Sequence, residues 1–201
     1  MKKVVISALC ALVFAACTNK DSVEHICFMS VPVDGGVTEF IRNVYMNGTN
    51  DKGCFSDNLE LQVDSVDFEK EKFYCAWREK NVLNDFLWMD FDVHWFSQTN
   101  KVAYLEGRTL LSEDMLRIFK TCLYESLGQA TYMGGMITDA IRNSWTVAEH
   151  ALFDTMSDNF CAWELANGYV IIDYTNPQTT DDKAMLMMFV VDKKNYCSHI
   201  I

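Results

Sequence analysis

Residues 86–96 constrain the fold of this chain more than any other stretch, because their side chains alternate along the backbone. The odd positions form an unbroken apolar face, made by Leu87, Met89, Phe91, Val93 and Trp95. The even positions place three polar side chains between two aromatic ones, in the order Trp88, Asp90, Asp92, His94 and Phe96. Successive side chains of a strand point to opposite faces of its sheet. The pattern therefore predicts a long strand with one face in the core and the other carrying ligand-type side chains.

Two turn signals predict hairpins elsewhere in the chain. Thr99-Asn100 follows the long strand and leads into an apolar stretch at 102–105, which predicts an antiparallel partner. Asn167-Gly168 is the dipeptide favoured where both turn residues need positive φ, so it predicts a second hairpin. Short alternations and continuous apolar runs predict the other strands, at 26–33, 59–63, 73–77, 161–166, 169–175, 184–191 and 196–201.

Helices are predicted from apolar spacing and from end signals. Ser112 is a suitable N-cap for a helix that Gly128 closes. Thr146, followed three residues later by Glu149, is a capping-box signature. The predicted helices cover 37–45, 113–127, 132–145 and 147–156. Together the elements predict the α+β class, as an antiparallel sheet that ends in a C-terminal meander, with amphipathic helices packed on it.

The composition is that of one domain of ordinary size. Half of the 201 residues are hydrophobic, which is enough for a substantial core. Six cysteines remain beyond residue 17. We expect buried thiols at positions inside apolar runs, namely Cys75, Cys122 and Cys161. At most one or two disulfides are expected, and the better candidates lie near loops or termini, namely Cys27, Cys54 and Cys197.

The first seventeen residues have the pattern of a secretory signal. Lys2 and Lys3 precede an apolar run at 4–14, and Ala15-Ala16 leads into Cys17. The run is much shorter than the roughly twenty residues that cross a bilayer as a helix. The expected outcome is therefore export and cleavage, with a retained membrane anchor as the alternative.

Because the cut falls before a cysteine, the stretch resembles the lipobox of bacterial lipoproteins. The resemblance covers these seventeen residues alone, and it implies that Cys17 is acylated and becomes the mature N-terminus. A triacylated cysteine holds a protein on a membrane without further help. We therefore expect a signal peptide at 1–16, a lipidated cysteine and tether at 17–25, and one globular α+β domain at 26–201. Thr18, in place of Asp after the cysteine, favours the outer membrane, and cleavage without lipid remains an alternative.

The charge of the chain restricts its partners. The formal net charge is −11, and removal of Lys2 and Lys3 with the leader changes it to about −13. Such a surface repels phosphate backbones, so we expect no nucleic-acid partner. The expected partners are the membrane, through the lipid, and a protein or glycan of the cell envelope.

Asp90, Asp92 and His94 are the candidate metal ligands, because they lie two residues apart on one strand face, about 7 Å between successive Cα atoms. Two carboxylates and an imidazole suit a hard or borderline ion. A solvated acidic face is the structural alternative, and a ligand-binding face that includes Trp88 and Phe96 is another. No familiar catalytic pattern occurs, so no catalytic residue and no cofactor are assigned.

The leading functional hypothesis is a lipid-anchored, non-enzymatic envelope protein that binds a protein or a glycan. The first alternative is a metal-assisted hydrolase that uses Asp90, Asp92 and His94. The second is an immunity-type protein whose acidic face blocks a basic toxin by electrostatic complementarity.

Overall fold

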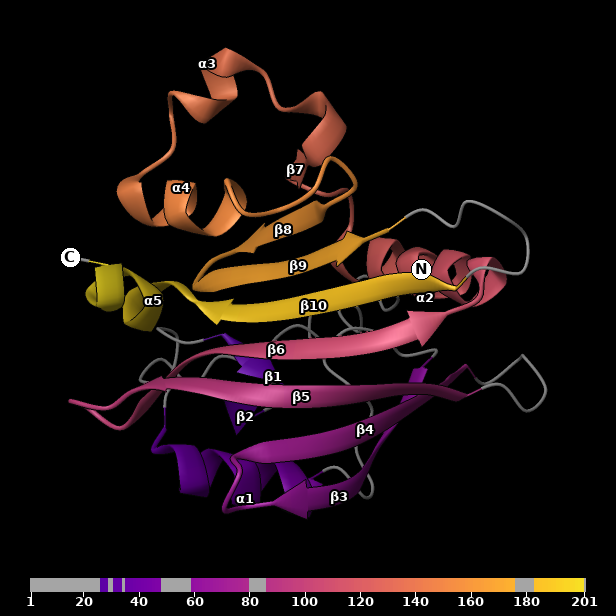
Figure 1. Ribbon diagram of the computed structural model, residues 1–201, viewed down its shortest axis with the longest axis vertical. Coiled ribbons are helices and arrows are strands. Elements are labelled where there is room, and N and C mark those ends of the chain that lie inside the picture. Colours follow the sequence, from indigo (N-terminus) through magenta and orange to yellow (C-terminus); the bar gives the residue numbers. More distant parts are fainter. Residues whose placement is uncertain are drawn as a thin grey trace, which may run out of the picture.

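The computed structural model describes residues 26–28, 31–33, 35–47, 59–79, 86–175 and 183–200, which are arranged around one large sheet (Figure 1). Eight strands lie in the order β3-β4-β5-β6-β10-β9-β8-β7, and every neighbouring pair is antiparallel. The predicted α+β class is confirmed. Over these ranges no helix is long and apolar enough to cross a bilayer.

Two antiparallel meanders make the sheet, and they meet where β6 pairs with β10. The first runs from β3 to β6, and the second runs from β8 to β10 with the short β7 at its edge. The strands are β3 (Leu59–Asp67), β4 (Lys72–Glu79), β5 (Phe86–Phe96), β6 (Lys101–Leu111), β7 (Tyr132–Met133), β8 (Cys161–Leu165), β9 (Gly168–Tyr174) and β10 (Ala184–Asp192).

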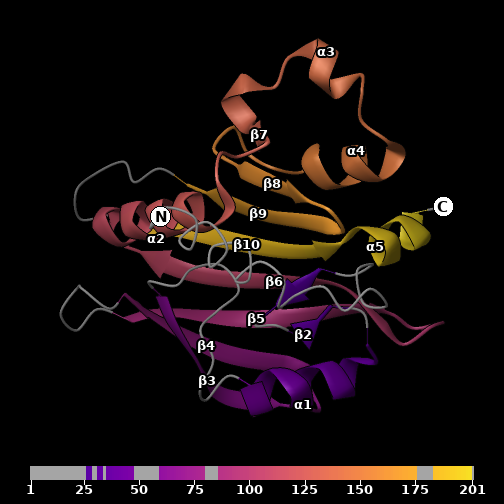
Figure 2. The same cartoon turned by 180° about the vertical axis from the view of Figure 1, so that it is seen from behind.

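One face of the sheet is covered by two helices and a small hairpin, which lie in front of it in Figure 2. The helices are α1 (Val37–Asn47) and α2 (Glu113–Leu127), and the hairpin pairs β1 (Cys27–Phe28) with β2 (Val31–Pro32). The predicted ends of α2 are confirmed, because the Ser112 hydroxyl accepts a hydrogen bond from the Met115 amide and Gly128 follows with a φ of 79°. Both are standard ways of satisfying the backbone at a helix end.

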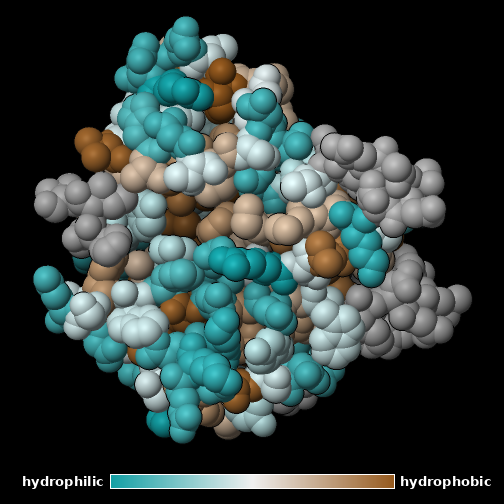
Figure 3. Space-filling model, viewed as in Figure 1, coloured by the Kyte–Doolittle hydropathy of each residue, from teal (hydrophilic) through white to brown (hydrophobic). Residues whose placement is uncertain are grey.

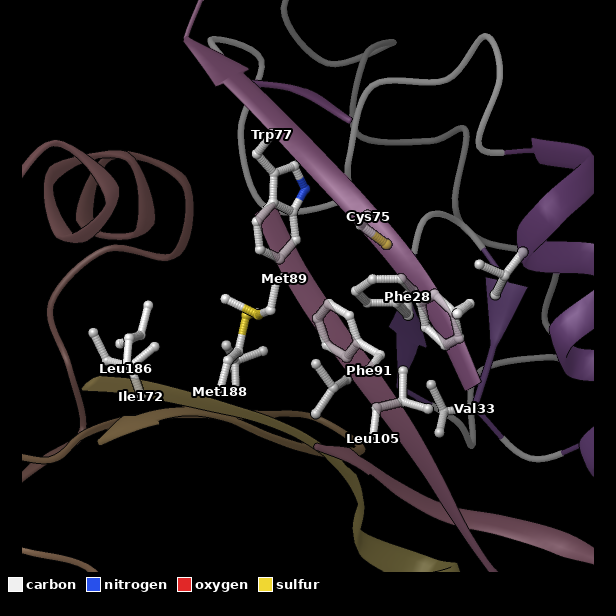
Figure 4. Packing of buried hydrophobic residues seen from close by; sticks show 14 of the residues in the cluster. Phe28, Val33, Cys75, Trp77, Met89, Phe91, Leu105, Ile172, Leu186 and Met188 are labelled. Carbon is white, nitrogen blue, oxygen red and sulfur yellow. The ribbon is translucent and has the colours of Figure 1, made fainter. Parts of the chain in front are cut away.

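The main core lies between this face and its cover (Figure 4). Phe91 of β5 is fully buried. Its ring stacks on Phe73 of β4 with 5.1 Å between centroids, and it meets Phe28 of β1 at the same separation. Trp77 packs edge-on against it from the β4 side. Aromatic contacts of these geometries add to the free energy gained from burying apolar area.

A second core covers the other face of the sheet at the β8–β10 end. It includes α4 (Val147–Phe153), whose Phe153 contacts Phe160 and Tyr169. The predicted capping box is present, since the Thr146 hydroxyl accepts from the Glu149 amide and the Glu149 carboxylate accepts from the Thr146 amide. The Tyr169 hydroxyl also donates to Glu149, at 2.5 Å. Burial opposes ionisation of Glu149, but these hydrogen bonds outweigh it and lower its pKa.

Three predicted elements are wrong. The single strand expected at 26–33 is instead the hairpin of β1 and β2, in which Phe28 pairs with Val31. Residues 132–145 were expected to be helical, but they contain β7, the 3₁₀ turn η2 (Gly134–Met136) and only the short α3 (Asp139–Arg142). Pairing of β7 with β8 overrides the helical spacing there. The expected last strand at 196–201 is also wrong, because β10 runs directly into α5 (Lys193–Ile200). The Asp192 carboxylate accepts from the Asn195 amide at 2.8 Å, which is the capping pattern of a helix start.

The second predicted hairpin forms, but the predicted turn conformation is wrong. Neither Asn167 nor Gly168 has positive φ, and Gly168 already belongs to β9, where it pairs with Leu165 and Asp192. A Cβ atom at Gly168 would lie 2.0 Å from the carbonyl oxygen of Val191. Glycine is therefore required here by close approach of two strands rather than by turn geometry.

The described cysteines agree in part with expectation. Cys75 and Cys161 are buried free thiols, and burial raises the pKa of Cys75. Cys197, a disulfide candidate, is also a free thiol. The lipobox, the tether and the candidate Cys54 lie outside the described residues.

Candidate functional site

The second face of β4, β5 and β6 carries polar side chains. Among the described helices, α5 reaches this face at β6, where Tyr196 packs edge-on against Tyr104. Figure 3 views this face, and hydrophilic side chains predominate over its lower part, where Figure 1 places these strands. The cause is the predicted alternation of β5, whose residues 87, 89, 91 and 93 are buried against the main core. Its even residues therefore point to the open side.

A row of charges crosses this open face, which we call the charge row: Lys72, Asp90, Asp92, Glu106 and Arg108. The strand register places Asp92 between Lys72 and Glu106, and Asp90 opposite Arg108. The Lys72 ammonium lies 2.7 Å from an Asp92 oxygen, and this contact raises the pKa of Lys72. Exposed pairs of this kind contribute little to stability but fix side-chain positions.

Glu106 is the most enclosed member of the charge row. Arg108 donates to its Oε1 through Nε at 2.8 Å and through Nη2 at 2.5 Å. His94 Nε2 lies 3.1 Å from its Oε2 but outside the angles of a directional hydrogen bond, and the His94 ring stacks on Tyr104 with 4.2 Å between centroids. The contact with His94, followed by Arg108, lowers the pKa of Glu106 despite partial burial.

Glu106→Gln is expected to lower the free energy of unfolding by about 1 kcal/mol at pH 7. Because folding lowers the pKa of Glu106 below its ordinary value of 4.5, its contribution is present above that value and is lost as the pH falls through the folded pKa. The difference between wild type and variant should therefore shrink as the pH falls from 7 to below 4.5, and it should approach zero once Glu106 is protonated in the folded protein. Urea unfolding across this range measures it, and a difference that stays constant with pH would contradict the account.

A β-bulge lies beside the charge row and corrects one prediction. The register of β5 and β6 shifts after His94, which pairs with Tyr104, so that Trp95 pairs with Val102 and Ala103 is the extra residue. Trp95 was expected in the core, but it is 39% exposed. Bulges occur often beside functional sites.

The bulge opens onto a groove of about 660 Å³ at the β5–β6 turn, which we call the hairpin groove. It is lined by residues 94–99, 101, 103 and 104, and by Lys194 and Asn195 at the start of α5. The stacked pair His94 and Tyr104 and the exposed residue Trp95 are among its lining residues. Burial raises the pKa of Tyr104, and the charge on Glu106 adds to this effect, so the Tyr104 hydroxyl is neutral near pH 7 and can donate a hydrogen bond.

The floor of the hairpin groove is held by hydrogen bonds between distant segments. The buried Asn195 side chain donates to the carbonyl oxygen of Val102 at 2.9 Å, which ties α5 to β6. The Val102 amide donates to the carbonyl oxygen of Gly35, ahead of α1. In the turn itself the Asn100 amide donates to the carbonyl oxygen of Phe96, and Asn100 has a φ of 55°. The groove is therefore built before any ligand arrives.

The structure separates the residues that the sequence pattern grouped as metal ligands. Asp92 contacts Lys72, whereas His94 contacts Glu106 on the next strand. Among the residues that the structure describes, no group of three His, Cys, Asp or Glu side chains could hold a metal ion. Of the two predicted ligand-binding aromatics, Phe96 lines the hairpin groove, whereas Trp88 is 52% exposed on β5 outside it.

Several site residues were missed from the sequence. Tyr104, Glu106 and Arg108 lie at every second position of β6 and face the same side as His94. Their alternation was a usable signal. The predicted strand ended at residue 105, however, whereas β6 continues to Leu111. Lys194 and Asn195 had no usable signal, because residues 193–195 were expected to be a turn that leads into a last strand.

Comparison with known proteins identifies no relative: no protein family, curated protein or solved structure matches this chain.

Proposed function

We propose that this protein is a lipid-anchored, non-enzymatic binding protein of the bacterial envelope and that it holds a saccharide in the hairpin groove. One observation carries the choice of ligand: the exposed indole of Trp95 lies beside a turn rich in hydroxyl and amide groups, at 97–99, in one groove. Aromatic faces pack on the apolar faces of sugar rings, while hydroxyl and amide groups bind the sugar hydroxyls. The groove volume lies within the range of small-molecule sites.

The placement in the envelope rests on the sequence of the first seventeen residues. Acylation of Cys17 would hold the domain on a membrane surface, with the outer membrane as the proposed location. The net charge of −11 argues against a nucleic-acid partner there. A saccharide of the envelope or its surroundings would meet such a protein directly.

The alternatives have less support. Blocking a basic toxin requires an open acidic surface, but Asp92 and Glu106 of the charge row already contact Lys72 and Arg108. A metal-assisted hydrolase would need its ligands gathered, and the described contacts direct Asp92 and His94 to different partners. A protein partner would contact the groove together with the surrounding face of the sheet. A binding experiment with glycans distinguishes a protein partner from a saccharide ligand.

The test is binding of the full-length protein, in a detergent without a sugar headgroup, to an array of neutral and acidic glycans. We expect at least one glycan to bind, and Trp95→Ala to weaken it by about thirtyfold, which corresponds to about 2 kcal/mol for the lost aromatic contact. Tryptophan fluorescence or calorimetry gives the affinities.

Trp88→Ala is the matched control, because Trp88 is also exposed on β5 but does not line the groove. It should leave the affinity unchanged. Failure of every glycan to bind, or equal loss in the two variants, would contradict the proposed function. Capture of a protein in place of a glycan would favour the protein-partner alternative.

A further inference from the structure

The charge of the hairpin groove is opposite to that of the chain as a whole. Two lysines, Lys101 and Lys194, line the groove, and no aspartate or glutamate is among the described residues of its lining. The chain has 28 acidic and 17 basic residues, so a patch with this composition differs from the average surface. On an acidic protein, the electrostatic field of the whole chain repels anions. A locally positive site therefore attracts an anion through the basic side chains at the site itself.

Two carboxylates adjoin the groove without lining it, and both are engaged by the protein. Glu106 contacts Arg108 and His94. Asp192 is fully buried and accepts from the Asn195 amide at the start of α5. Neither of these two carboxylates lines the groove.

Lys101 is held by its backbone while its side chain remains exposed. It begins β6, pairs with Phe96 across the turn and makes an isolated bridge to Gly36. Its ammonium makes no ion pair with any residue in the described part of the chain. Lys101 pairs with Phe96, and both residues line the groove together with Trp95, so a saccharide held there lies within reach of Lys101.

We propose that the hairpin groove selects a saccharide whose rings carry carboxylates, with Lys101 and Lys194 binding the carboxylate and Trp95 packing on the ring. This inference rests on the proposed function, because it names the ligand class of the same groove. Uronic-acid chains and sialylated sugars share the required chemistry, and the experiment distinguishes these two sources.

The experiment uses two matched pairs of probes with the full-length protein. One pair is oligogalacturonate and its methyl ester, and the other is sialyllactose and lactose. In at least one pair the acidic member should bind about tenfold more tightly than its neutral counterpart. Lys101→Gln should weaken the acidic member by about fivefold and so reduce the ratio of the acidic to the neutral affinity. Lys194→Gln should act in the same direction.

Lys183→Gln is the control, because Lys183 is also exposed but precedes β10 at the end opposite to Asp192. It should change neither affinity. Equal binding of acidic and neutral members would overturn this inference while leaving the proposed function intact. Failure of all four probes would overturn the inference as well, and failure of the whole glycan array would overturn both. An acid preference that survives in the Lys101→Gln, Lys194→Gln double variant would also overturn it.

Discussion

Gly168→Ala is expected to lower the free energy of unfolding by about 3 kcal/mol, because there is no space for a methyl group. The Cβ atom would lie 2.0 Å from the Val191 carbonyl oxygen and 3.2 Å from the Ile26 side chain. The first neighbour is backbone of the adjacent strand, so a side-chain rotation cannot relieve the contact. Separation of β9 from β10 at this point would disturb the second meander and the start of α5.

Urea denaturation of wild type and variant measures this effect. Gly35→Ala is the matched control, since no atom lies within 4 Å of the position that its Cβ would take and its φ is not in the left-handed region. It should change stability by no more than about 0.5 kcal/mol. A Gly168→Ala protein as stable as wild type would contradict the described pairing of β9 and β10.

Cys17→Ala is expected to abolish attachment of fatty acid to the protein. Each buried methylene of an acyl chain contributes about 0.8 kcal/mol to membrane binding, so several chains together anchor a protein firmly. The measurement is incorporation of labelled fatty acid, together with the mass of the N-terminal peptide. The wild-type peptide should begin at Cys17 and carry acyl groups.

Cys10→Ala is the control for this experiment, because Cys10 lies inside the apolar run of the leader. It should leave acylation unchanged. An unmodified or uncleaved wild-type N-terminus would contradict the proposed anchor, as would acylation that persists in Cys17→Ala. The readout is the acyl group itself, because a retained leader would also hold the protein on a membrane.

Elements whose signals are local were predictable from the sequence. The alternation at 86–96 predicts β5 with its observed bounds, because burial of one sheet face imposes a period of two. Ser112 and Gly128 mark α2, and Thr146 with Glu149 marks the start of α4, since backbone groups at helix ends need nearby partners. In all three cases, residues close together in the sequence determine the element.

Features that depend on distant contacts were not predictable. Trp95 is exposed beside a register shift against β6, and the pattern of β5 alone cannot reveal that shift. The start of α5 depends on how Asp192 and Asn195 meet the end of β10 and Val102. The hairpin groove is lined by residues of 94–104 and by 194–195. These segments lie far apart in the sequence, so the pattern of one does not predict its contact with the other. The contacts of Asp92 with Lys72 and of His94 with Glu106 were not anticipated for the same reason, because Lys72 lies on β4 and Glu106 on β6.

The most direct test of the hairpin groove as the binding site is the nuclear magnetic resonance spectrum of the tryptophan indole groups during titration with the tightest-binding glycan. The chain has five tryptophans, of which Trp88 and Trp95 are the exposed ones among the described residues. We expect the Trp95 indole signal to shift in proportion to saturation while the Trp88 signal stays in place. A saturating glycan that leaves Trp95 unshifted, or that shifts Trp88 alone, would contradict the assignment of this groove as the binding site.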